Sequence, residues 1–288
     1  MCSYMPMWFT FTEPHSHIVH NRKQQIIFNM PTFLFDKIIF GPVKSRRLGV
    51  SLGINLLPTN IKVCSFDCIY CECGRNPKKY EEKAVLPSRM EVQQKLKEKL
   101  EEMVAENLLP DVITFAGNGE PTLHPEFAGI IDDTIELRNQ LSPNARIAVL
   151  SNATMIHKKE VFQALLKVED NIQKLDSAFE ETIQLLDCPN KNFSLKKTVE
   201  QLTAFQGKVI IQTLFVKGSY KGETVDNTTE KEISAWIELL KIIKPSQVMI
   251  YTIARDTPID TLEKVTAKDL NLIANQIENV GFKVQVSA

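Results

Sequence analysis

The sequence predicts an α/β fold in which parallel strands alternate with outer helices. From residue 50 onward, short β-branched segments alternate strictly with amphipathic segments, a pattern typical of parallel sheets covered by helices. Six such strand–helix units are followed by one final strand. No Gly/Ser-rich linker or low-complexity tract interrupts them, so we expect a single domain over residues 31–288. A doubly wound sheet and an open or closed barrel both fit this pattern.

Seven segments have the aliphatic and β-branched composition of buried strands. The first ends at Pro58, which has no amide hydrogen to donate to a sheet. The predicted strands span residues 50–57, 112–116, 146–150, 171–175, 208–216, 247–252 and 282–286. After the fifth predicted strand, residues 218–226 contain two glycines, and here we expect a surface loop.

The helices are predicted from capping signals and apolar spacing. Ser88 and Glu91 form a capping box, and an apolar stripe of three- and four-residue spacing follows it. That stripe consists of Val92, Leu96, Leu100, Met103 and Val104. Asn227, with Glu230 three residues later, is the predicted N-cap of another helix. The predicted helices span residues 89–106, 125–141, 157–168, 194–205 and 266–279, with one more beginning after Asn227.

Composition and charge exclude several classes of protein. The 288 residues are 43% apolar and carry a net charge of −1, which excludes wholesale disorder and gives no global field toward nucleic acid or membrane. No apolar run approaches the roughly 18 residues of a membrane span. Residues 1–30 lack the basic region and cleavage site of a signal peptide, and we expect them to form a loose extension. Function therefore has to be inferred from local motifs.

Four of the six cysteines lie within ten residues. Cys64, Cys68, Cys71 and Cys73 are too close together for the disulfide framework of a secreted protein. Such clustering indicates a metal site in a reducing compartment, so we expect a cytoplasmic protein. The first three thiolates could hold a [4Fe–4S] cluster and leave one iron with an open coordination position.

Two other interpretations of these cysteines remain open. All four sulfurs could bind one zinc ion in a non-enzymatic RNA- or protein-binding module, although Cys71 and Cys73 are closer in sequence than zinc knuckles usually are. Cys68 and Cys71 could instead form a C-x-x-C redox pair, which leaves Cys64 without a role.

The spacing Cys64-x3-Cys68-x-Tyr70-Cys71 resembles the signature of the radical S-adenosylmethionine (radical SAM) enzymes. The resemblance extends from about Pro42 over nearly the whole remaining chain and implies a partial (β/α)6 barrel of parallel strands with outer helices. It implies a [4Fe–4S] cluster on Cys64, Cys68 and Cys71, with S-adenosylmethionine on the open iron. Reductive cleavage of that cofactor would give a 5′-deoxyadenosyl radical that abstracts hydrogen from a substrate. Tyr70 would pack near the adenine.

Further motifs follow the other predicted strands. The turn Gly117-Asn118-Gly119-Glu120 resembles the family's glycine-rich motif for the amino group of the cofactor, with Asn118 in place of the usual second glycine. Asn152 resembles a polar position beside the methionine moiety, and a helix-cap or turn role for it is equally open. Asp176 is expected to bind the ribose. Arg255 could bind an anion or form a surface ion pair. In parallel βα geometry, all of these lie at one end of the sheet.

The sequence indicates less about the substrate. Residues 41–53 resemble a subgroup of iron–sulfur oxidoreductases related to the enzymes that make the wyosine base of tRNA, which makes tRNA a candidate partner. Between Asp36 and Arg89 the chain has ten basic and five acidic residues, a local charge of +5. That charge could serve the thiolates or bind RNA phosphates. The cysteines of a second cluster are lacking, however. We expect a single-cluster enzyme with an unidentified substrate and a low-potential flavodoxin- or ferredoxin-type electron donor.

Overall fold

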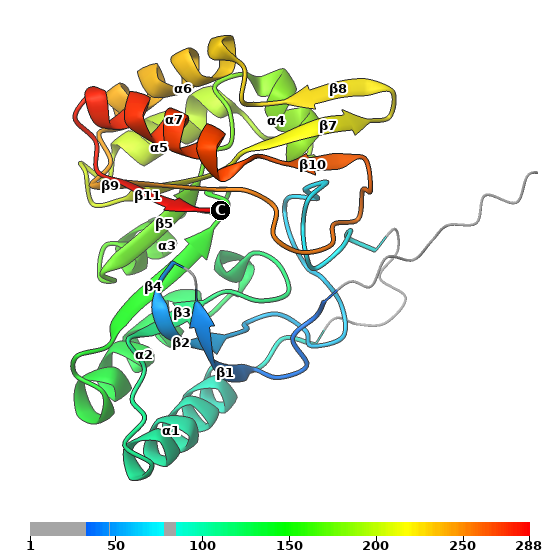
Figure 1. The fold of residues 1–288 in the computed structure, drawn as a ribbon. Helices are drawn as coiled ribbons and strands as arrows, with labels where there is room; N and C mark the ends of the chain where they lie inside the picture. Colours follow the sequence, from blue (N-terminus) through cyan, green and yellow to red (C-terminus); the bar gives the residue numbers. More distant parts are fainter. Residues whose placement is uncertain (1–32, 46, 78–84) are drawn as a thin grey trace, which may run out of the picture.

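The computed structural model describes residues 33–45, 47–77 and 85–288. Its main sheet has eight strands that curl into a partial barrel, in the order β1-β2-β3-β4-β5-β6-β9-β11 (Figure 1). The seven parallel strands are β2 (Gly49–Ile54), β3 (Val112–Phe115), β4 (Arg146–Ser151), β5 (Asp170–Lys174), β6 (Ile210–Leu214), β9 (Gln247–Tyr251) and β11 (Val284–Ser287). Strand β1 (Ile39–Ser45) pairs antiparallel with β2 at one edge. The predicted partial barrel is confirmed.

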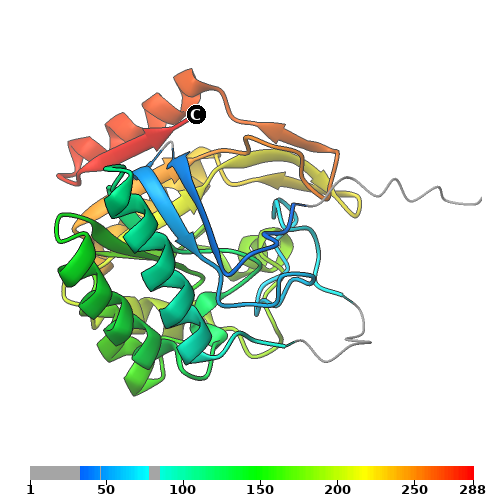
Figure 2. The same cartoon turned by 90° about the horizontal axis from the view of Figure 1, so that it is seen from below.

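Helices cover the outer face of this sheet (Figure 2). They are α1 (Arg89–Ala105), α2 (Phe127–Leu141), α3 (Lys159–Leu165), α4 (Glu180–Leu186), α5 (Leu195–Thr203), α6 (Glu230–Ile243) and α7 (Ala267–Asn279). Ser88 caps α1 as the sequence predicts, by accepting a hydrogen bond from the amide of Glu91. The other predicted cap is wrong, because Thr229 caps α6. Asn227 is buried and its side chain contacts the backbone of Leu214 and Val216 instead.

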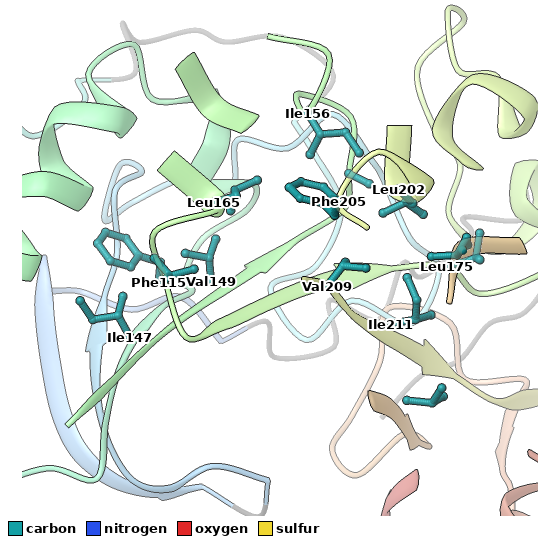
Figure 3. Close-up of a cluster of buried hydrophobic side chains, with 14 of the residues drawn as sticks. Phe115, Ile147, Val149, Ile156, Leu165, Leu175, Leu202, Phe205, Val209 and Ile211 are labelled. Carbon is teal, nitrogen blue, oxygen red and sulfur yellow. The ribbon is translucent and has the colours of Figure 1, made fainter. Parts of the chain in front are cut away.

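The strands have two different faces. On the outer face, side chains such as Phe115, Val149 and Ile211 pack against the helices, where Leu165 and Phe205 meet them (Figure 3). On the inner face, one residue from each of several strands joins Leu48 in a small apolar plug inside the barrel. Its other members are Val112, Ala148, Ile172, Ile210 and Met249. The polar side chains of the inner face therefore come from residues further along the strands, after these apolar positions.

A second sheet, which the sequence analysis missed, replaces the expected surface loop. Strands β7 (Val216–Tyr220), β8 (Glu223–Asp226) and β10 (Leu262–Lys264) form it in the order β10-β7-β8, and all pairs are antiparallel. Lys221 and Gly222, both with positive φ, make the two-residue hairpin turn between β7 and β8. The hairpin packs against the cysteine loop.

One further prediction is wrong, and another concerns residues that the structure does not describe. Val104, placed in the apolar stripe of the first helix, is exposed on α1. The predicted extension over residues 1–30 lies outside the described residues. Among those that are described, no helix has the length and apolar character needed to span a bilayer.

Candidate functional site

A cavity of about 380 Å³ opens at the carboxyl ends of the parallel strands. It brings together most of the side chains that the sequence analysis selected from separate segments. Those that line it are Cys64, Cys68, Tyr70, Cys71, Cys73, Gly117, Gly119, Glu120, Asn152 and Arg255. Two selected residues, Asn118 and Asp176, are absent from its lining. A larger groove of about 820 Å³ runs along α1 on the outside of the fold, and none of the selected residues lines it.

Local hydrogen bonds hold the cysteine loop in its shape. The amides of Asp67 and Ile69 donate to the backbone oxygens of Asp187 and Leu186, each at 2.9 Å. The Asn76 side chain donates to the oxygens of Cys64 (3.1 Å) and Phe66 (2.9 Å). Asn76 was not selected from the sequence, and no spacing signal marks it because its partners lie ten and twelve residues earlier.

Lys62 adds a buried positive charge beside the thiols. Its ammonium donates to the oxygen of Gly74 at 2.7 Å and lies 3.6 Å from the Asp67 carboxylate. Burial alone would lower the pKa of Lys62, but Cys71 and the other two motif cysteines outweigh burial and raise it. A lysine that stays charged here favours thiolates over thiols.

The thiols differ in their own proton affinity. A hydrogen bond with the Cys73 side chain lowers the pKa of Cys71 to about 5. The charge of Lys62 adds to this shift, and burial opposes it. Burial raises the pKa of Cys64 to about 12, and burial also raises the pKa of Cys68 above its ordinary value. Among the described residues, no group of three or more His, Cys, Asp or Glu side chains is arranged to hold a single metal ion.

Glu120 begins a short 3-10 helix, Pro121–Leu123, and lies at the cavity wall. Its carboxylate accepts hydrogen bonds from the amide and hydroxyl of Thr122, and from the amide of Asn152 at 2.7 Å. Burial raises the pKa of Glu120, while these donors oppose that shift. The carboxylate is thus fixed between β3 and β4, with Oε1 and Oε2 held by different segments.

Asn152 connects this turn to the cysteine loop. Its side-chain amide donates to the Ser65 hydroxyl at 2.9 Å and lies 3.5 Å from Cys64 Sγ. Its side-chain oxygen accepts from the amide and hydroxyl of Thr154, so the turn role anticipated from the sequence is present as well. One side chain therefore stabilises its own turn and contacts a motif cysteine.

Asn118, unlike Gly117 and Gly119 beside it, is absent from the lining of the cavity. It is fully buried. Its side-chain oxygen accepts a hydrogen bond from the amide of Phe35, and its side-chain amide donates to the backbone oxygens of Phe35 and Pro58. These contacts tie the segment before β1 to the glycine turn. The side chain of Asn118 therefore supports the turn from behind, and a cofactor contact at this position stays a prediction.

Asp176 is also held behind the cavity. Its carboxylate accepts from the amide of Leu214 at 3.0 Å, and contacts the Tyr70 hydroxyl and the Lys174 ammonium. Asp176 thus contacts Tyr70, the residue expected beside the adenine, and its predicted contact with a ribose stays a prediction. Asp176 follows β5 after one intervening residue, Leu175, whereas Lys174, the last residue of that strand, lines the cavity.

Lys174 is a residue that the sequence analysis missed. Its ammonium lies 2.5 Å from the Tyr70 hydroxyl and 3.0 Å from Asp176. The Tyr70 hydroxyl also lies 2.7 Å from Asp187. Burial, followed by the nearby charge of Asp176, raises the pKa of Asp187 to about 7. This buried network fixes the edge of the Tyr70 ring and leaves the ring at the cavity.

Arg255 lies at the cavity rim and pairs with Glu72 at 2.8 Å. Both side chains are largely exposed, at 66% and 40%. Of the two interpretations that the sequence left open, the structure shows the surface ion pair.

Comparison with known proteins gives this arrangement a family. Residues 61–208, about half of the chain, match the family model of the radical SAM superfamily. The chain belongs to the radical SAM superfamily. Members use a [4Fe–4S] cluster and S-adenosylmethionine, so the protein is an enzyme of the class that cleaves this cofactor at an iron–sulfur cluster. The expected relation to wyosine-forming enzymes stays a prediction.

Three sequence relatives of this radical SAM protein span most of it. A protein named GTPase Obg from Brachyspira hyodysenteriae is 30% identical over 88% of the chain, which covers 35% of that relative. A UPF0026 protein of Methanocaldococcus jannaschii is 32% identical over 75% of the chain and 63% of its own length. A UPF0026 protein of Helicobacter pylori is 31% identical over 76% of the chain and 67% of its own length. The chain thus spans about a third to two thirds of these relatives.

Solved structures of other radical SAM proteins share the fold. A radical SAM methyltransferase from Sphaerobacter thermophilus superposes with a TM-score of 0.61 at 12% identity, over 82% of this chain and 65% of that one. Streptococcus suis SuiB bound to S-adenosylmethionine gives 0.57 at 14% identity, over 79% and 49%. At this identity the likeness concerns the fold alone.

Proposed function

We propose that this radical SAM enzyme holds one [4Fe–4S] cluster through Cys64, Cys68 and Cys71 and acts on a substrate bound inside the barrel. When bound, the cluster supplies the electron that cleaves S-adenosylmethionine to methionine and a 5′-deoxyadenosyl radical. The observation that carries the proposal is that three thiols of one short loop line the same cavity as Glu120 and Asn152. The donor set fits the cluster, because thiolates are its usual ligands.

The chain's own residues would hold the cofactor at this cavity. Glu120 offers a fixed, buried carboxylate to an ammonium, and Gly117 and Gly119 keep the neighbouring backbone free of side chains. Tyr70 offers an aromatic ring whose hydroxyl is already bonded, so that its apolar part remains for an adenine. Asn152 offers an amide at Cys64.

The electron has to come from outside the described residues. A one-electron reduction of a sulfonium requires a cluster toward the low end of the range of about −700 to +450 mV. We propose a low-potential donor of the flavodoxin or ferredoxin type. The buried Lys62 beside the thiolates compensates part of their negative charge and so eases the addition of an electron.

Anaerobic reconstitution tests this function directly. We expect about four irons per chain, the content of one [4Fe–4S] cluster, and formation of 5′-deoxyadenosine with dithionite and S-adenosylmethionine. Cys68→Ala should retain almost no iron. Cys188→Ala is the matched control, because Cys188 is absent from the cavity lining and should leave the iron content unchanged. A colourless protein that binds one zinc would contradict the proposal.

A further inference from the structure

Arg47 reaches the cavity from the opposite end of the barrel. It lies in the turn between β1 and β2, where its amide donates to the Ser45 hydroxyl at 3.3 Å. Its backbone oxygen accepts a hydrogen bond from Gln285 of β11 at 2.7 Å, which ties the first turn to the last strand. The side chain then lines the cavity, with its Cζ 4.5 Å from the centroid of the Tyr251 ring.

This guanidinium has an unfilled hydrogen-bonding position. Its Nη1 is buried and has no partner among the described residues. Arg75 also has such an atom, but its Nε pairs with Asp67 at 3.0 Å. A buried charged donor without a partner is strongly unfavourable, and native structures retain one mainly where something else binds.

The cavity offers Arg47 no carboxylate of its own. The acidic residues that line it are Glu72 and Glu120. Glu72 pairs with Arg255 at the rim, and Glu120 accepts from Thr122 and Asn152. Of the other buried cations that line it, Lys174 pairs with Asp176 and Lys62 lies 3.6 Å from Asp67. No carboxylate that lines the cavity therefore pairs with Arg47.

Gln212 adds a second donor on the neighbouring strand. It is buried on β6, lines the cavity, and its side-chain amide has only a weak partner, the Met249 sulfur at 4.0 Å. Strand β6 pairs directly with β9, which carries Tyr251. In the sheet order, β6 is three positions and β9 is four positions from β3, which precedes Glu120. The two donors thus lie on the side of the barrel away from the proposed site of the cofactor's amino group.

We propose that Arg47 and Gln212 bind a carboxylate or phosphate group of the substrate, which is a small anionic molecule. This inference rests on the proposed function, because it places the substrate in the same cavity. A flat guanidinium stacked on Tyr251 presents N–H donors that match two oxygens of such an anion. A small molecule fits better than a nucleic acid, since the apolar plug that includes Leu48 closes the barrel beneath.

Anion binding can be measured without knowing the substrate. Inorganic phosphate and acetate, at constant ionic strength, are titrated into the reconstituted protein, and apparent affinity is taken from the rise in thermal unfolding temperature under anaerobic conditions. At least one anion should stabilise the wild-type protein, with the same affinity whether or not S-adenosylmethionine is present. Stronger binding of phosphate would indicate a phosphorylated substrate, and stronger binding of acetate a carboxylic acid.

Substitutions locate the binding site. Arg47→Gln should weaken the preferred anion by about tenfold or more, as expected for loss of a charge-assisted pair. Arg255→Gln, which removes a rim arginine already paired with Glu72, should change it less than about twofold. Gln212→Leu provides a second variant with reduced affinity in case Arg47→Gln does not fold.

Three results would overturn the inference. They are stabilisation by neither anion, equal affinity in the Arg47→Gln and wild-type proteins, and competition between the anion and S-adenosylmethionine, which would assign Arg47 to the cofactor. The iron content of each sample is counted separately. A failure of the proposed function would therefore appear as missing iron, and a failure of this inference as missing anion binding in iron-loaded protein.

Discussion

Val63 and Gly119 form a parallel bridge that joins the cysteine loop to the glycine turn. The amide of Val63 donates to the oxygen of Asn118 at 2.9 Å, and the oxygen of Val63 accepts from the amide of Glu120 at 3.1 Å. A Cβ atom on Gly119 would lie 1.9 Å from that same oxygen. The position of Cys64 relative to Glu120 therefore depends on the absence of one side chain.

Gly119→Ala should separate these two segments. The new methyl group meets backbone rather than a flexible side chain, and φ at this position is +139°. We expect the free energy of unfolding to fall by about 2–4 kcal/mol, from strain plus steric overlap, and iron retention after reconstitution to fall with it. Urea unfolding and iron counting measure the two effects.

Gly222→Ala is the matched control for this substitution. Gly222 also has a positive φ, +84°, but a Cβ atom there meets nothing within 4 Å. We expect a loss of about 1 kcal/mol from backbone strain and unchanged iron content. Equal iron loss in the two variants would show that strain alone, and not the contact with Val63, explains the effect.

Local signals in the sequence were sufficient for most of the fold. The capping box at Ser88 and the spacing of its apolar stripe placed α1 to within one residue at its end, because both signals lie within the helix itself. The cysteine spacing and the glycine turn are likewise recognised from residues that are neighbours in the sequence. Parallel βα geometry then predicted correctly that both would line one cavity.

The missed features depend on contacts between distant segments. Arg47 lies in a turn before the first predicted strand, and only the pairing of that turn with β11, 238 residues later, brings it into the barrel. Asp176 was assigned to the cofactor because it follows a strand, but its partners Tyr70 and Leu214 come from other segments. Periodicity within one segment contains no information about such partners.

Residues 118 and 120 are expected to affect different properties. Asn118→Ala removes a buried side chain that bonds to Phe35 and Pro58 and leaves their backbone groups unsatisfied, so the free energy of unfolding should fall by about 2–3 kcal/mol. Glu120→Gln keeps the shape but removes the charge offered to an ammonium. It should weaken S-adenosylmethionine binding by about tenfold or more.

Equilibrium dialysis with labelled S-adenosylmethionine, combined with urea unfolding, separates these two effects. The expected pattern is lower stability for Asn118→Ala and lower cofactor affinity for Glu120→Gln in iron-loaded protein. Normal affinity in the Glu120 variant would remove Glu120 from the proposed cofactor site.

Cys73 distinguishes a cluster from a zinc site. Its thiol donates to the oxygen of Gly117 at 3.4 Å and it lines the same cavity as the three motif cysteines. If the motif cysteines alone hold a cluster, Cys73→Ala should retain about four irons, while Cys71→Ala should lose nearly all. Metal analysis of both variants provides the comparison. Parallel loss of a single zinc ion in both would establish the four-sulfur zinc site instead.

Lys174 is expected to be important for stability. Lys174→Met leaves Asp176, which has no exposed side-chain surface, without its cation. Because breaking a buried ion pair leaves an uncompensated charge, the free energy of unfolding should fall by about 3–5 kcal/mol. Adding Asp176→Asn to this variant should restore part of the loss, since it removes the remaining charge.

An exposed ion pair provides the control for Lys174. Lys241 and Glu238 on α6 are 2.6 Å apart with exposed fractions of 46% and 65%. Lys241→Met should change the free energy of unfolding by at most about 1 kcal/mol, because water already solvates both groups. Similar losses in the two lysine variants, measured by urea unfolding, would contradict a special role for the buried network.

The β7–β8 hairpin covers the cysteine loop and should protect whatever that loop holds. Val225 of β8 is 1% exposed and belongs to the same apolar cluster as Phe66 and Ile69 of the loop. Val225→Ala should lower the free energy of unfolding by about 1–3 kcal/mol and loosen this cover. The visible absorbance of the reconstituted protein should then bleach several-fold faster in air, whereas Val43→Ala, on a 47% exposed valine of β1, should bleach at the wild-type rate. Equal bleaching rates in the two valine variants would show that the hairpin does not shield the site.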